Sequence, residues 1–192
     1  MPGKTNNNGN IYVGLVHYPV YDKRGNIVAT AVTTVDIHDI ARSAKTFDVK
    51  GFYVITPLAS QNQLVQRVVR HWVEGMGATY NPTRQAALSL VKVAESMEGA
   101  IGDISRHWKS GVKVVATGAR SQRRNIGYHR FKEILSEASQ PFLLLFGTGW
   151  GLTEEVMRHC DYVLAPIEGA HYNHLSVRSA AAIILDRLLG RG

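Results

Sequence analysis

The clearest candidate for a ligand-binding segment is PFLLLFGTGWGLTEEV, residues 141–156. Here an apolar strand runs into closely spaced glycines, and a helix is expected to begin just after them. A glycine-rich turn between a strand and a helix presents backbone N–H groups to an anionic or nucleotide ligand. The pattern therefore predicts a ligand site at this turn and leaves the identity of the ligand open.

A dinucleotide is one candidate ligand for this turn. Gly147, Gly149 and Gly151 give the spacing GxGxG, whereas the dinucleotide fingerprint is GxGxxG. Glu168 ends the next expected strand, about 20 residues on, near the place of a ribose-binding acid. Against this interpretation, only one strand and one helix follow the turn, although a nucleotide half-site needs further strand–helix units. A NAD-dependent oxidoreductase is therefore kept as an alternative function.

A second set of polar residues lies on a helix that is expected to begin at Asp36. His38, Asp39 and Arg42 stand at positions i, i+1 and i+4, and they project away from the apolar stripe of this helix. That stripe consists of Ile37, Ile40, Ala41 and Ala44. A solvated helix face would carry the same polar residues. His17, at the end of the first expected strand, is a further group that could accept a proton.

The distribution of charge indicates a phosphate-bearing partner. The chain has a formal net charge of +7, and no Asp or Glu interrupts a run of Lys and Arg residues between Ile104 and Lys132. Such a run in a basic domain favours contact with nucleic-acid phosphates, although a solvated helix face would also produce it. The candidate nucleic-acid-binding residues are Arg120, Arg123, Arg124, Tyr128 and Arg130, with the Tyr128 ring available to stack on a base.

The composition narrows the class of protein. With 192 residues, 45% of them hydrophobic, the chain can bury one sizeable core. The single cysteine, Cys160, excludes an internal disulfide and is typical of a reducing cytoplasm. No apolar run is long enough to span a bilayer, no secretion signal opens the chain, and no His or Cys spacing indicates a metal site. We expect a cytoplasmic, metal-free protein in which residues 1–10 are a disordered N-terminal segment and residues 11–192 form a single domain.

The helices and strands that carry these residues can be predicted from the periodicity of the sequence. Apolar strands are predicted over residues 11–18, 51–57, 112–118, 141–147 and 162–167. Helices are predicted from residue 36 and over residues 62–75, 84–97, 102–109, 128–138, 153–159 and 173–190. Continuous apolar strands that alternate with helices predict an α/β fold with a mostly parallel sheet and helices on both faces.

Three strand-end segments, read together, resemble the S-adenosylmethionine site of the SPOUT superfamily of knotted RNA methyltransferases. They are VVATGARS, LLFGTGWGL and VLAPIEGAHYNHLSVRSAAAIIL. The segment VDIHDIARSAKTFDVKGFYVITP is similar to the first motif of that superfamily, and the four segments cover most of the chain between residues 36 and 189. GTGWGL with YNHLSVRSA most resembles a small bacterial family that is found alone or fused to a tRNA guanine-N1 methyltransferase.

The resemblance implies a deep C-terminal trefoil knot, a homodimer and S-adenosylmethionine as the cofactor. The three loops would hold the cofactor largely through backbone groups, which suit an uncharged adenine. Their glycines would let the backbone approach the ligand closely. The implied cofactor-binding residues are Thr117, Gly118, Ala119, Phe146, Gly147, Thr148, Gly149, Ile167, Gly169, Leu175, Ser176 and Ser179.

The resemblance also places Arg42 at the position of the superfamily's catalytic arginine. Because a guanidinium keeps its proton in proteins, we interpret Arg42 as a clamp on RNA phosphate or as a stabiliser of a developing alkoxide. Asp36, Asp39 or His17 would then accept the proton. The expected substrate is RNA, specifically tRNA, and the favoured acceptor is a ribose 2′-hydroxyl, with a base nitrogen as the competitor.

Several positions depart from the pattern of the superfamily. Asp36 stands where the first motif has Asn, and Trp150 replaces a Glu of the second motif. Ser176 replaces an Asn of the third motif, and Arg178 follows it in place of a small residue. These changes leave cofactor binding intact and the acceptor atom open. A non-catalytic RNA-binding module that kept the fold is therefore a second alternative.

Overall fold

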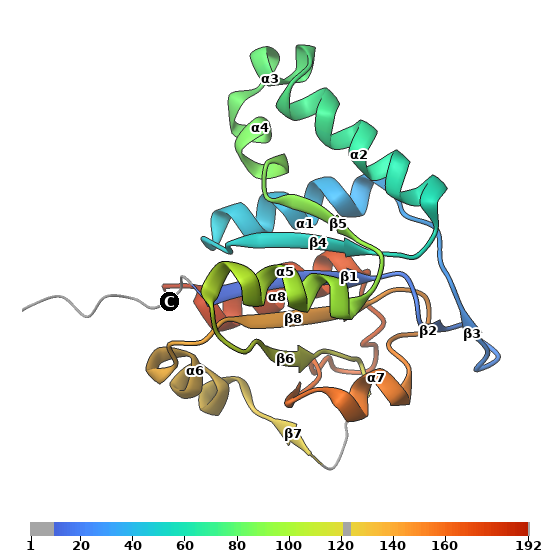
Figure 1. The fold of residues 1–192 in the computed structure, drawn as a ribbon. Helices are drawn as coiled ribbons and strands as arrows, with labels where there is room; N and C mark the ends of the chain where they lie inside the picture. Colours follow the sequence, from blue (N-terminus) through green and yellow to red (C-terminus); the bar gives the residue numbers. More distant parts are fainter. Residues whose placement is uncertain (1–9, 121–123, 192) are drawn as a thin grey trace, which may run out of the picture.

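The computed structural model describes residues 10–120 and 124–191, which are arranged around a seven-stranded sheet (Figure 1). The strands follow the order β5-β4-β1-β8-β6-β9-β7, and every pairing between them is parallel. They are β1 (Ile11–Val16), β4 (Gly51–Ile55), β5 (Val91–Ala94), β6 (Lys113–Ala116), β7 (Asn125–Ile126), β8 (Phe142–Gly147) and β9 (Tyr162–Leu164). The predicted parallel sheet is confirmed.

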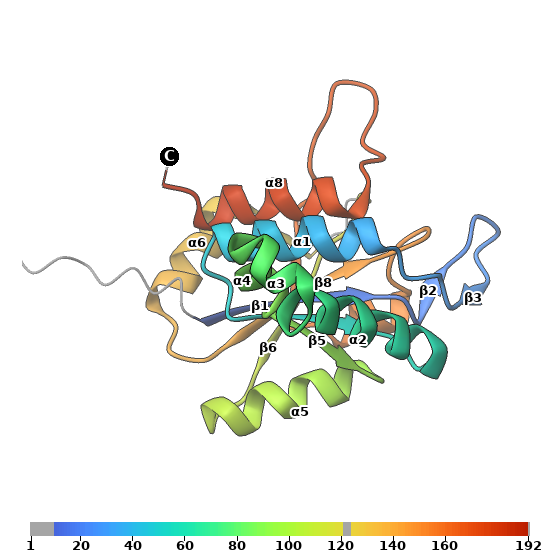
Figure 2. The same ribbon diagram turned by 90° about the horizontal axis from the view of Figure 1, so that it is seen from above.

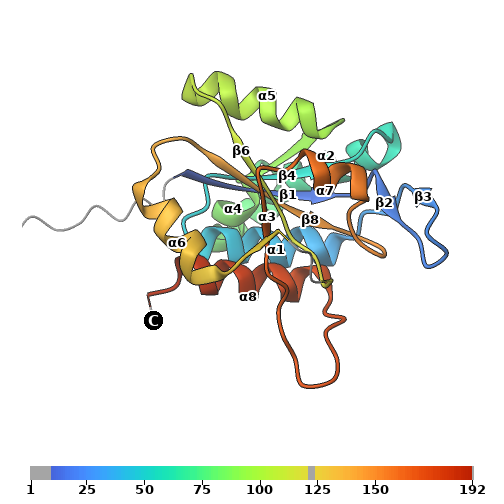
Figure 3. The same ribbon diagram turned by 90° about the horizontal axis from the view of Figure 1, so that it is seen from below.

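Helices cover both faces of this sheet (Figures 2 and 3). One face carries α1 (Thr34–Thr46), α2 (Ala59–Val73), α4 (Pro82–Leu88), α6 (Tyr128–Glu137) and α8 (Val177–Leu189). The other face carries α5 (Met97–Trp108) and α7 (Glu154–His159). The short helix α3 (Met76–Tyr80) joins α2 to α4 above α1 (Figure 1). The predicted two-faced α/β architecture is therefore also confirmed.

The central position of β8 in the sheet explains why its sequence is apolar at every position from Phe142 to Phe146. Phe142, Leu144 and Phe146 point into the core beneath α1 and α8, whereas Leu143 and Leu145 point into the core beneath α5 and α7. Side chains alternate between the two faces of a strand, so a strand covered on both faces needs apolar residues at every position.

The predicted helix over residues 84–97 is wrong in its second half. Helix α4 ends at Leu88, and Val91–Ala94 form the edge strand β5, which pairs with β4. The β-branched Val91 and Val93 pack on one face of the sheet, while Lys92 emerges on the other face. This period of two contradicts a helix, but the strand is only four residues long, so the helical residues before it dominate the pattern.

Helix α1 begins slightly earlier than its sequence predicts. Thr33 is the N-cap: its hydroxyl accepts a hydrogen bond from the N–H of Asp36 and donates one to the Asp36 carboxylate at 2.6 Å. Asp36 is therefore not the cap residue but the third residue of the first turn, where a carboxylate also meets the positive end of the helix dipole.

The C-terminal elements are shorter than predicted, and a long loop separates them. Strand β9 ends at Leu164 and helix α8 begins at Val177, with Ser176 as its N-cap. Residues 168–176 are all exposed, and the loop extends away from the sheet before it returns to α8 (Figures 2 and 3).

Two small additions were not foreseen. Strands β2 (Val20–Tyr21) and β3 (Ile27–Val28) form an antiparallel hairpin after β1, and β7 adds a parallel edge beside β9. Asn10, the last residue of the segment expected to be disordered, is buried, and its amide donates to the carbonyl oxygen of Ala138. Residues 1–9 lie outside the described part of the chain.

None of the helices in the described ranges is long and apolar enough to cross a membrane.

Candidate active site

Three loops meet at the edge of the sheet where its parallel strands end. Strands β8, β6 and β9 are neighbours, so the loops that follow Gly147, Ala116 and Leu164 leave the sheet side by side. The Asn173 amide donates to the carbonyl oxygen of Ala119 at 2.9 Å, which ties the loop after β9 to the loop after β6. In open α/β sheets this edge is where ligands bind.

The glycine turn after β8 is held by its own backbone and by strand β2. The N–H of Gly151 donates to the carbonyl of Thr148 at 3.0 Å, and Gly149 and Gly151 adopt φ values of +58° and +101°. Tyr21 of β2 donates to Gly151 and accepts from the N–H of Trp150 at 2.8 Å. The turn is therefore braced from outside the motif by strand β2 of the hairpin.

The reason that the turn needs glycine differs from the one expected. A Cβ atom at Gly147 would lie 2.6 Å from the backbone nitrogen of Leu152, and one at Gly149 would lie 2.8 Å from the carbonyl oxygen of Tyr21. Both glycines are thus required by the protein's own backbone rather than by the approach of a ligand. Gly118 is different, because its nearest neighbour would be the Met157 methyl at an ordinary 3.8 Å.

The threonines of these loops turn their hydroxyls inward. Thr117 donates to the carbonyl of Leu145 at 2.9 Å, and Thr148 donates to the carbonyl of Val16 at 2.9 Å. The Phe146 side chain is 1% exposed and belongs to the core. These side chains therefore anchor the loops, and what the loops can offer a ligand is their backbone.

The two large apolar candidates in the loop after β9 lie in different surroundings. Ile167 packs against the core, whereas Leu175 is 41% exposed in the protruding segment. Gly169 permits a tight turn, since a Cβ atom there would collide with the carbonyl oxygen of Tyr172. Ser176 and Ser179 bond to each other at the start of α8, where Ser176 caps the helix. The two serines thus have a structural role that the sequence motif does not reveal.

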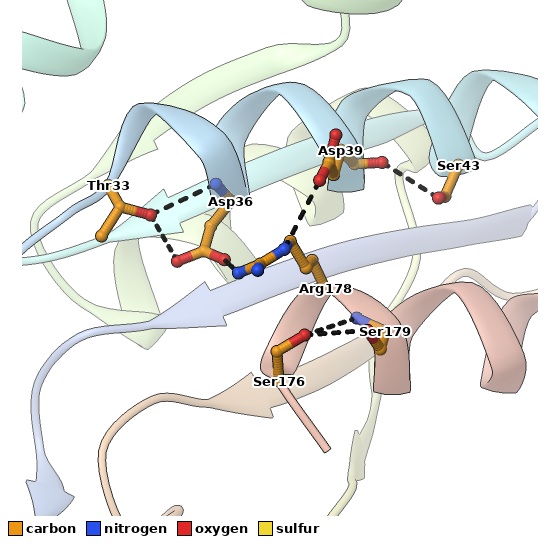
Figure 4. A network of polar contacts seen from close by, with 7 residues as sticks. All are labelled: Thr33, Asp36, Asp39, Ser43, Ser176, Arg178 and Ser179. Atoms are coloured by element: carbon orange, nitrogen blue, oxygen red, sulfur yellow. Dashed lines mark hydrogen bonds and ion pairs between the residues drawn. The ribbon is translucent and has the colours of Figure 1, made fainter.

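An ion-pair network joins the start of α8 to the start of α1 (Figure 4). Arg178 approaches the Asp36 carboxylate at 3.2 Å through one terminal nitrogen and Asp39 at 3.5 Å through Nε. Thr33 completes the surroundings of Asp36, whose side chain is only 12% exposed. Asp36 is therefore occupied by two partners, while Asp39, 49% exposed, keeps most of its carboxylate open.

Replacing Arg178 by methionine is expected to destabilise the fold by about 1 kcal/mol, because it leaves the nearly buried Asp36 with one partner. It should also lower cofactor affinity severalfold, since α8 and the loop before it lose their tie to α1. Urea unfolding and calorimetry measure the two effects, and Arg178→Lys should recover part of each because it keeps the charge without the fork geometry. A double-mutant cycle with Asp36→Asn that gives no coupling energy would contradict the clamp.

His17 lies at the end of β1, beside the glycine turn, and its side chain is completely buried. Its Nδ1 is 3.0 Å from the Thr30 hydroxyl, which in turn contacts the hydroxyl of Thr148. Burial lowers the pKa of His17 to about 4, although the nearby Asp36 carboxylate acts in the opposite direction. The imidazole is therefore neutral at physiological pH, and it is shielded from any substrate in this conformation.

The remaining residues of the first helix point in two directions. The His38 ring packs edge-on against Trp72, 5.5 Å away, and burial together with the charge of Arg84 lowers its pKa. His38 thus faces α2 and α4 rather than the loops. Arg42 is exposed and lies six residues beyond Asp36, which is about 9 Å along the helix. Among residues 10–120 and 124–191, no hydrogen bond or ion pair joins its guanidinium to the glycine turn.

The basic residues expected to contact nucleic acid fall into two groups. Arg120 and Arg124 are exposed and form no ion pair with any residue that the structure describes. Arg130 pairs with Glu133 at 2.6 Å, and the Tyr128 ring is half-buried with the Arg187 guanidinium 5.0 Å above it. One face of the ring that was expected to stack on a base is thus covered by the protein itself. Arg123 lies outside the described residues.

Sequence reasoning missed Thr30 and Asn173. Thr30 connects His17 to the glycine turn, and Asn173 ties two of the loops together. Asn173 stands inside a recognised motif and could have been singled out there. Thr30 carries no signal, because its partner in the turn is 118 residues away in the sequence.

Solved structures with the same arrangement of strands and helices show which class of protein has this fold. The SpoU methyltransferase AviRb of Streptomyces viridochromogenes aligns with a TM-score of 0.58 at 20% identity, over 94% of this chain and 59% of that one. A TrmH/SpoU tRNA-modifying enzyme of A. aeolicus aligns with a TM-score of 0.57 at 15% identity, over 94% of this chain and 74% of that one. The fold is that of SPOUT methyltransferases.

Sequence comparisons give the family. A family model described as "SAM-dependent RNA methyltransferase" matches residues 10–190. An uncharacterised protein of Aquifex aeolicus is 38% identical over 96% of this chain and 90% of its own length. A tRNA (guanine-N(1)-)-methyltransferase of Oleidesulfovibrio alaskensis is 46% identical over 94% of this chain, which is 42% of that longer protein. This chain belongs to the family of S-adenosylmethionine-dependent RNA methyltransferases.

This membership confirms the resemblance to the SPOUT superfamily and leaves the oxidoreductase alternative without support. The glycine turn belongs to a SPOUT fold rather than to a dinucleotide-binding half. The described residues also contain no group of three or more His, Cys, Asp or Glu side chains that could hold a metal ion.

Proposed function

We propose that this protein is a cytoplasmic, homodimeric S-adenosylmethionine-dependent methyltransferase that acts on tRNA, with a ribose 2′-hydroxyl as the acceptor. The observation that carries the proposal is the meeting of three strand-end loops at one edge of the sheet, in a chain whose family uses this cofactor. The homologues named as tRNA methyltransferases support the choice of tRNA.

The residues at these loops fit the cofactor. The hydroxyls of Thr117 and Thr148 are turned inward, so the loops after β6 and β8 offer backbone groups, which suit the uncharged adenine. Gly118 leaves room for close approach on the outer side, because only the Met157 methyl, 3.8 Å away, would contact a side chain there. Ile167 and Leu175 would supply apolar surface if the loop before α8 closes over the ligand.

S-adenosylmethionine supplies an electrophilic methyl group, so the protein's task is to orient the acceptor and to manage one proton. Arg42 would stabilise the charge that develops on the attacking oxygen, since its guanidinium does not lose a proton. Asp36 is engaged by Arg178 and Thr33, and His17 is fully buried. Asp39 lies one helical turn before Arg42 with an accessible carboxylate, so we assign it as the proton acceptor.

A second copy of the chain would complete the site. The loop over residues 168–176 is exposed throughout, with Tyr172 71% and Leu175 41% exposed, and no contact among the described residues joins Arg42 to the glycine turn. The resemblance to the SPOUT superfamily implies a C-terminal knot and a dimer, and we expect α8 to contribute to the dimer interface. Light scattering would measure the mass directly. A cytoplasmic setting is supported by the single Cys160, a buried thiol whose pKa burial raises to about 11.

Methylation of a guanine N1 is the second candidate, because two relatives at 46% and 47% identity carry that name. This chain spans only 42% of the length of each of them. The named activity could therefore belong to the part of those proteins that lies outside the aligned region.

The test is transfer of a labelled methyl group to bacterial tRNA, followed by digestion to nucleosides. We expect a ribose-methylated nucleoside, and Arg42→Ala should lower kcat about 100-fold, the usual effect of removing one donor that stabilises developing charge. Lys45→Ala, an exposed cation on the same helix, is the matched control and should leave kcat unchanged.

The identity of the labelled product separates the candidates. A labelled guanine base would transfer the proposal to the second candidate. Cofactor binding without transfer to any RNA would favour a non-catalytic RNA-binding module that kept the fold.

A further inference from the structure

An open groove of about 760 Å³ lies at the far edge of the sheet, away from the three cofactor loops. Its floor is the outer edge of β5, and its walls are α2 and α5. The polar side chains that line it include Tyr53, Arg70, Lys92, Glu95, Asp103 and Arg106. None of these residues has a role in the site described above.

The floor of the groove presents unpaired backbone groups. The N–H of Phe52 donates to the carbonyl of Leu90, and the N–H of Thr56 donates to the carbonyl of Ala94. The even-numbered residues of β5 therefore direct their backbone groups toward β4. Because backbone groups alternate along a strand, Val91 and Val93 direct their N–H and C=O groups into the groove. The floor can therefore donate hydrogen bonds to a ligand.

Asp103 of α5 gathers two cations of the groove, Lys92 of β5 and Arg106 of α5. Asp103 accepts hydrogen bonds from Tyr53 and from Lys92, the latter at 2.9 Å, and pairs with Arg106 at 3.5 Å. These interactions hold the pKa of Asp103 below its usual range. The Lys92 and Arg106 side chains remain 54% and 76% exposed, so Asp103 orients them without using up their donors.

The opposite wall adds a free cation. Arg70 of α2 is exposed and forms no ion pair within the described ranges 10–120 and 124–191. Glu95, at the end of β5, is the acid of the groove that no described cation pairs with. Three cations face two carboxylates, one of which is fully engaged, so the groove is rich in hydrogen-bond donors.

We propose that this groove binds the phosphate backbone of the RNA substrate. An extended peptide could also pair with the edge of β5, but the excess of cationic over acidic side chains in the groove and the net charge of +7 favour a polyanion. The assignment deepens the proposed function and rests on it for the identity of the RNA.

The groove is placed so that one RNA can reach both sites. Strands β4 and β1 separate β5 from β8, so the end of the groove lies about 14 Å across the sheet from the glycine turn. The ends of all parallel strands lie at the same edge. Arg70 and Arg106 lie in the last turns of α2 and α5, about 17 Å and 14 Å along these helices from that edge. A folded RNA whose target nucleotide is at β8 can therefore follow the groove and contact the two arginines with phosphates further along its backbone.

The test is the affinity of bacterial tRNA for the full chain, measured over a series of salt concentrations. Arg70→Ala and Arg106→Ala are each expected to weaken binding about 5-fold, and the double variant about 25-fold. Each lost contact should reduce the slope of log affinity against log salt by about 0.7 to 0.9. Arg67→Ala, an exposed arginine of α2 that does not line the groove, is the control and should change neither quantity.

Removing a negative charge from the groove gives a second test, in which tRNA binding is expected to tighten rather than weaken. Glu95→Gln should tighten tRNA binding, whereas Glu98→Gln, an exposed acid nearby on α5 that does not line the groove, should not. Unchanged affinity and slope in the Arg70/Arg106 double variant would overturn the proposal, and so would equal effects of Arg67→Ala. Binding of S-adenosylmethionine, followed by calorimetry, should be unaffected in all these variants, so failure of the groove is distinguishable from failure of the proposed function.

Discussion

Alanine at position 147 is expected to abolish S-adenosylmethionine binding, with affinity lowered at least 100-fold, and to destabilise the fold by about 2 kcal/mol. The added Cβ would lie 2.6 Å from the nitrogen of Leu152 and 2.9 Å from the carbonyl carbon of Gly151. Both contacts are with backbone, which cannot rotate away as a side chain can, so the turn must open. An opened turn no longer aligns the backbone groups that a cofactor would contact.

The Gly118→Ala variant tests whether a glycine is needed for cofactor binding rather than for the stability of the fold. Its Cβ would meet only the Met157 methyl at 3.8 Å, so the free energy of unfolding should stay unchanged. If the cofactor packs closely against this loop, the same methyl group should lower its affinity about 10-fold. Loss of binding with unchanged stability is the signature of direct contact.

Calorimetry with S-adenosylmethionine and urea unfolding of the two variants provide the measurements. Gly111→Ala is a suitable control, because a Cβ atom there would have no neighbour within 4 Å and the residue lies outside the loops. Normal cofactor binding by Gly147→Ala would remove the glycine turn from the site. Normal binding by Gly118→Ala would place the ligand away from the loop after β6.

The sheet could be predicted from the sequence because its central strands bury both faces. In β8 every residue from Phe142 to Phe146 is apolar and buried, and a short run that is apolar at every position is typical of a strand covered on both sides. The short strands could not be predicted. Strands β2, β3 and β7 have two residues each, and β5 has four, which is too short for an alternating apolar pattern to be recognised. What makes them strands is pairing with segments that are distant in the sequence.

The site could be predicted only as far as its motifs are local. The glycine turn is visible as a pattern of six residues, but the reason for each glycine depends on Leu152 and on Tyr21 of the β2–β3 hairpin. The contact between Arg178 and Asp36 spans 142 residues, and no pattern near either residue indicates it. The proton-accepting roles assigned to Asp36 and His17 were equally local inferences, and they did not include the burial of both side chains.

The second large effect is expected on the pH dependence of stability, through His17. The hydrogen bonds of His17 determine which of its ring nitrogens carries the proton. Thr148 donates its hydroxyl proton to the carbonyl of Val16 at 2.9 Å, so it can only accept from Thr30. Thr30 has then used its proton and must accept from His17, whose carbonyl it approaches only at 3.5 Å. The neutral imidazole is therefore protonated at Nδ1, and its buried Nε2 is a bare acceptor without a partner in the described chain.

Acidification is expected to destabilise the fold through this residue. The pKa of His17 is about 4 in the folded chain and 6.5 in its ordinary state, so the unfolded chain binds more protons between these values. Stability therefore falls as the pH drops from 6.5 to 4, and it falls no further from this source below 4. The full loss is on the order of 3 kcal/mol, a large part of the stability of a domain of this size.

Replacing His17 by glutamine should remove this dependence, since an amide can still donate to Thr30 but does not titrate. Urea unfolding at pH 7 and at pH 4 should show that the wild-type chain loses more stability than His17→Gln, by about 3 kcal/mol. His171→Gln, an exposed histidine of the loop before α8, should behave as the wild type does. Equal losses in the wild type and in His17→Gln would mean that the folded chain accepts a proton at His17, and the hydrogen-bond chain to the glycine turn would then need a different arrangement of protons.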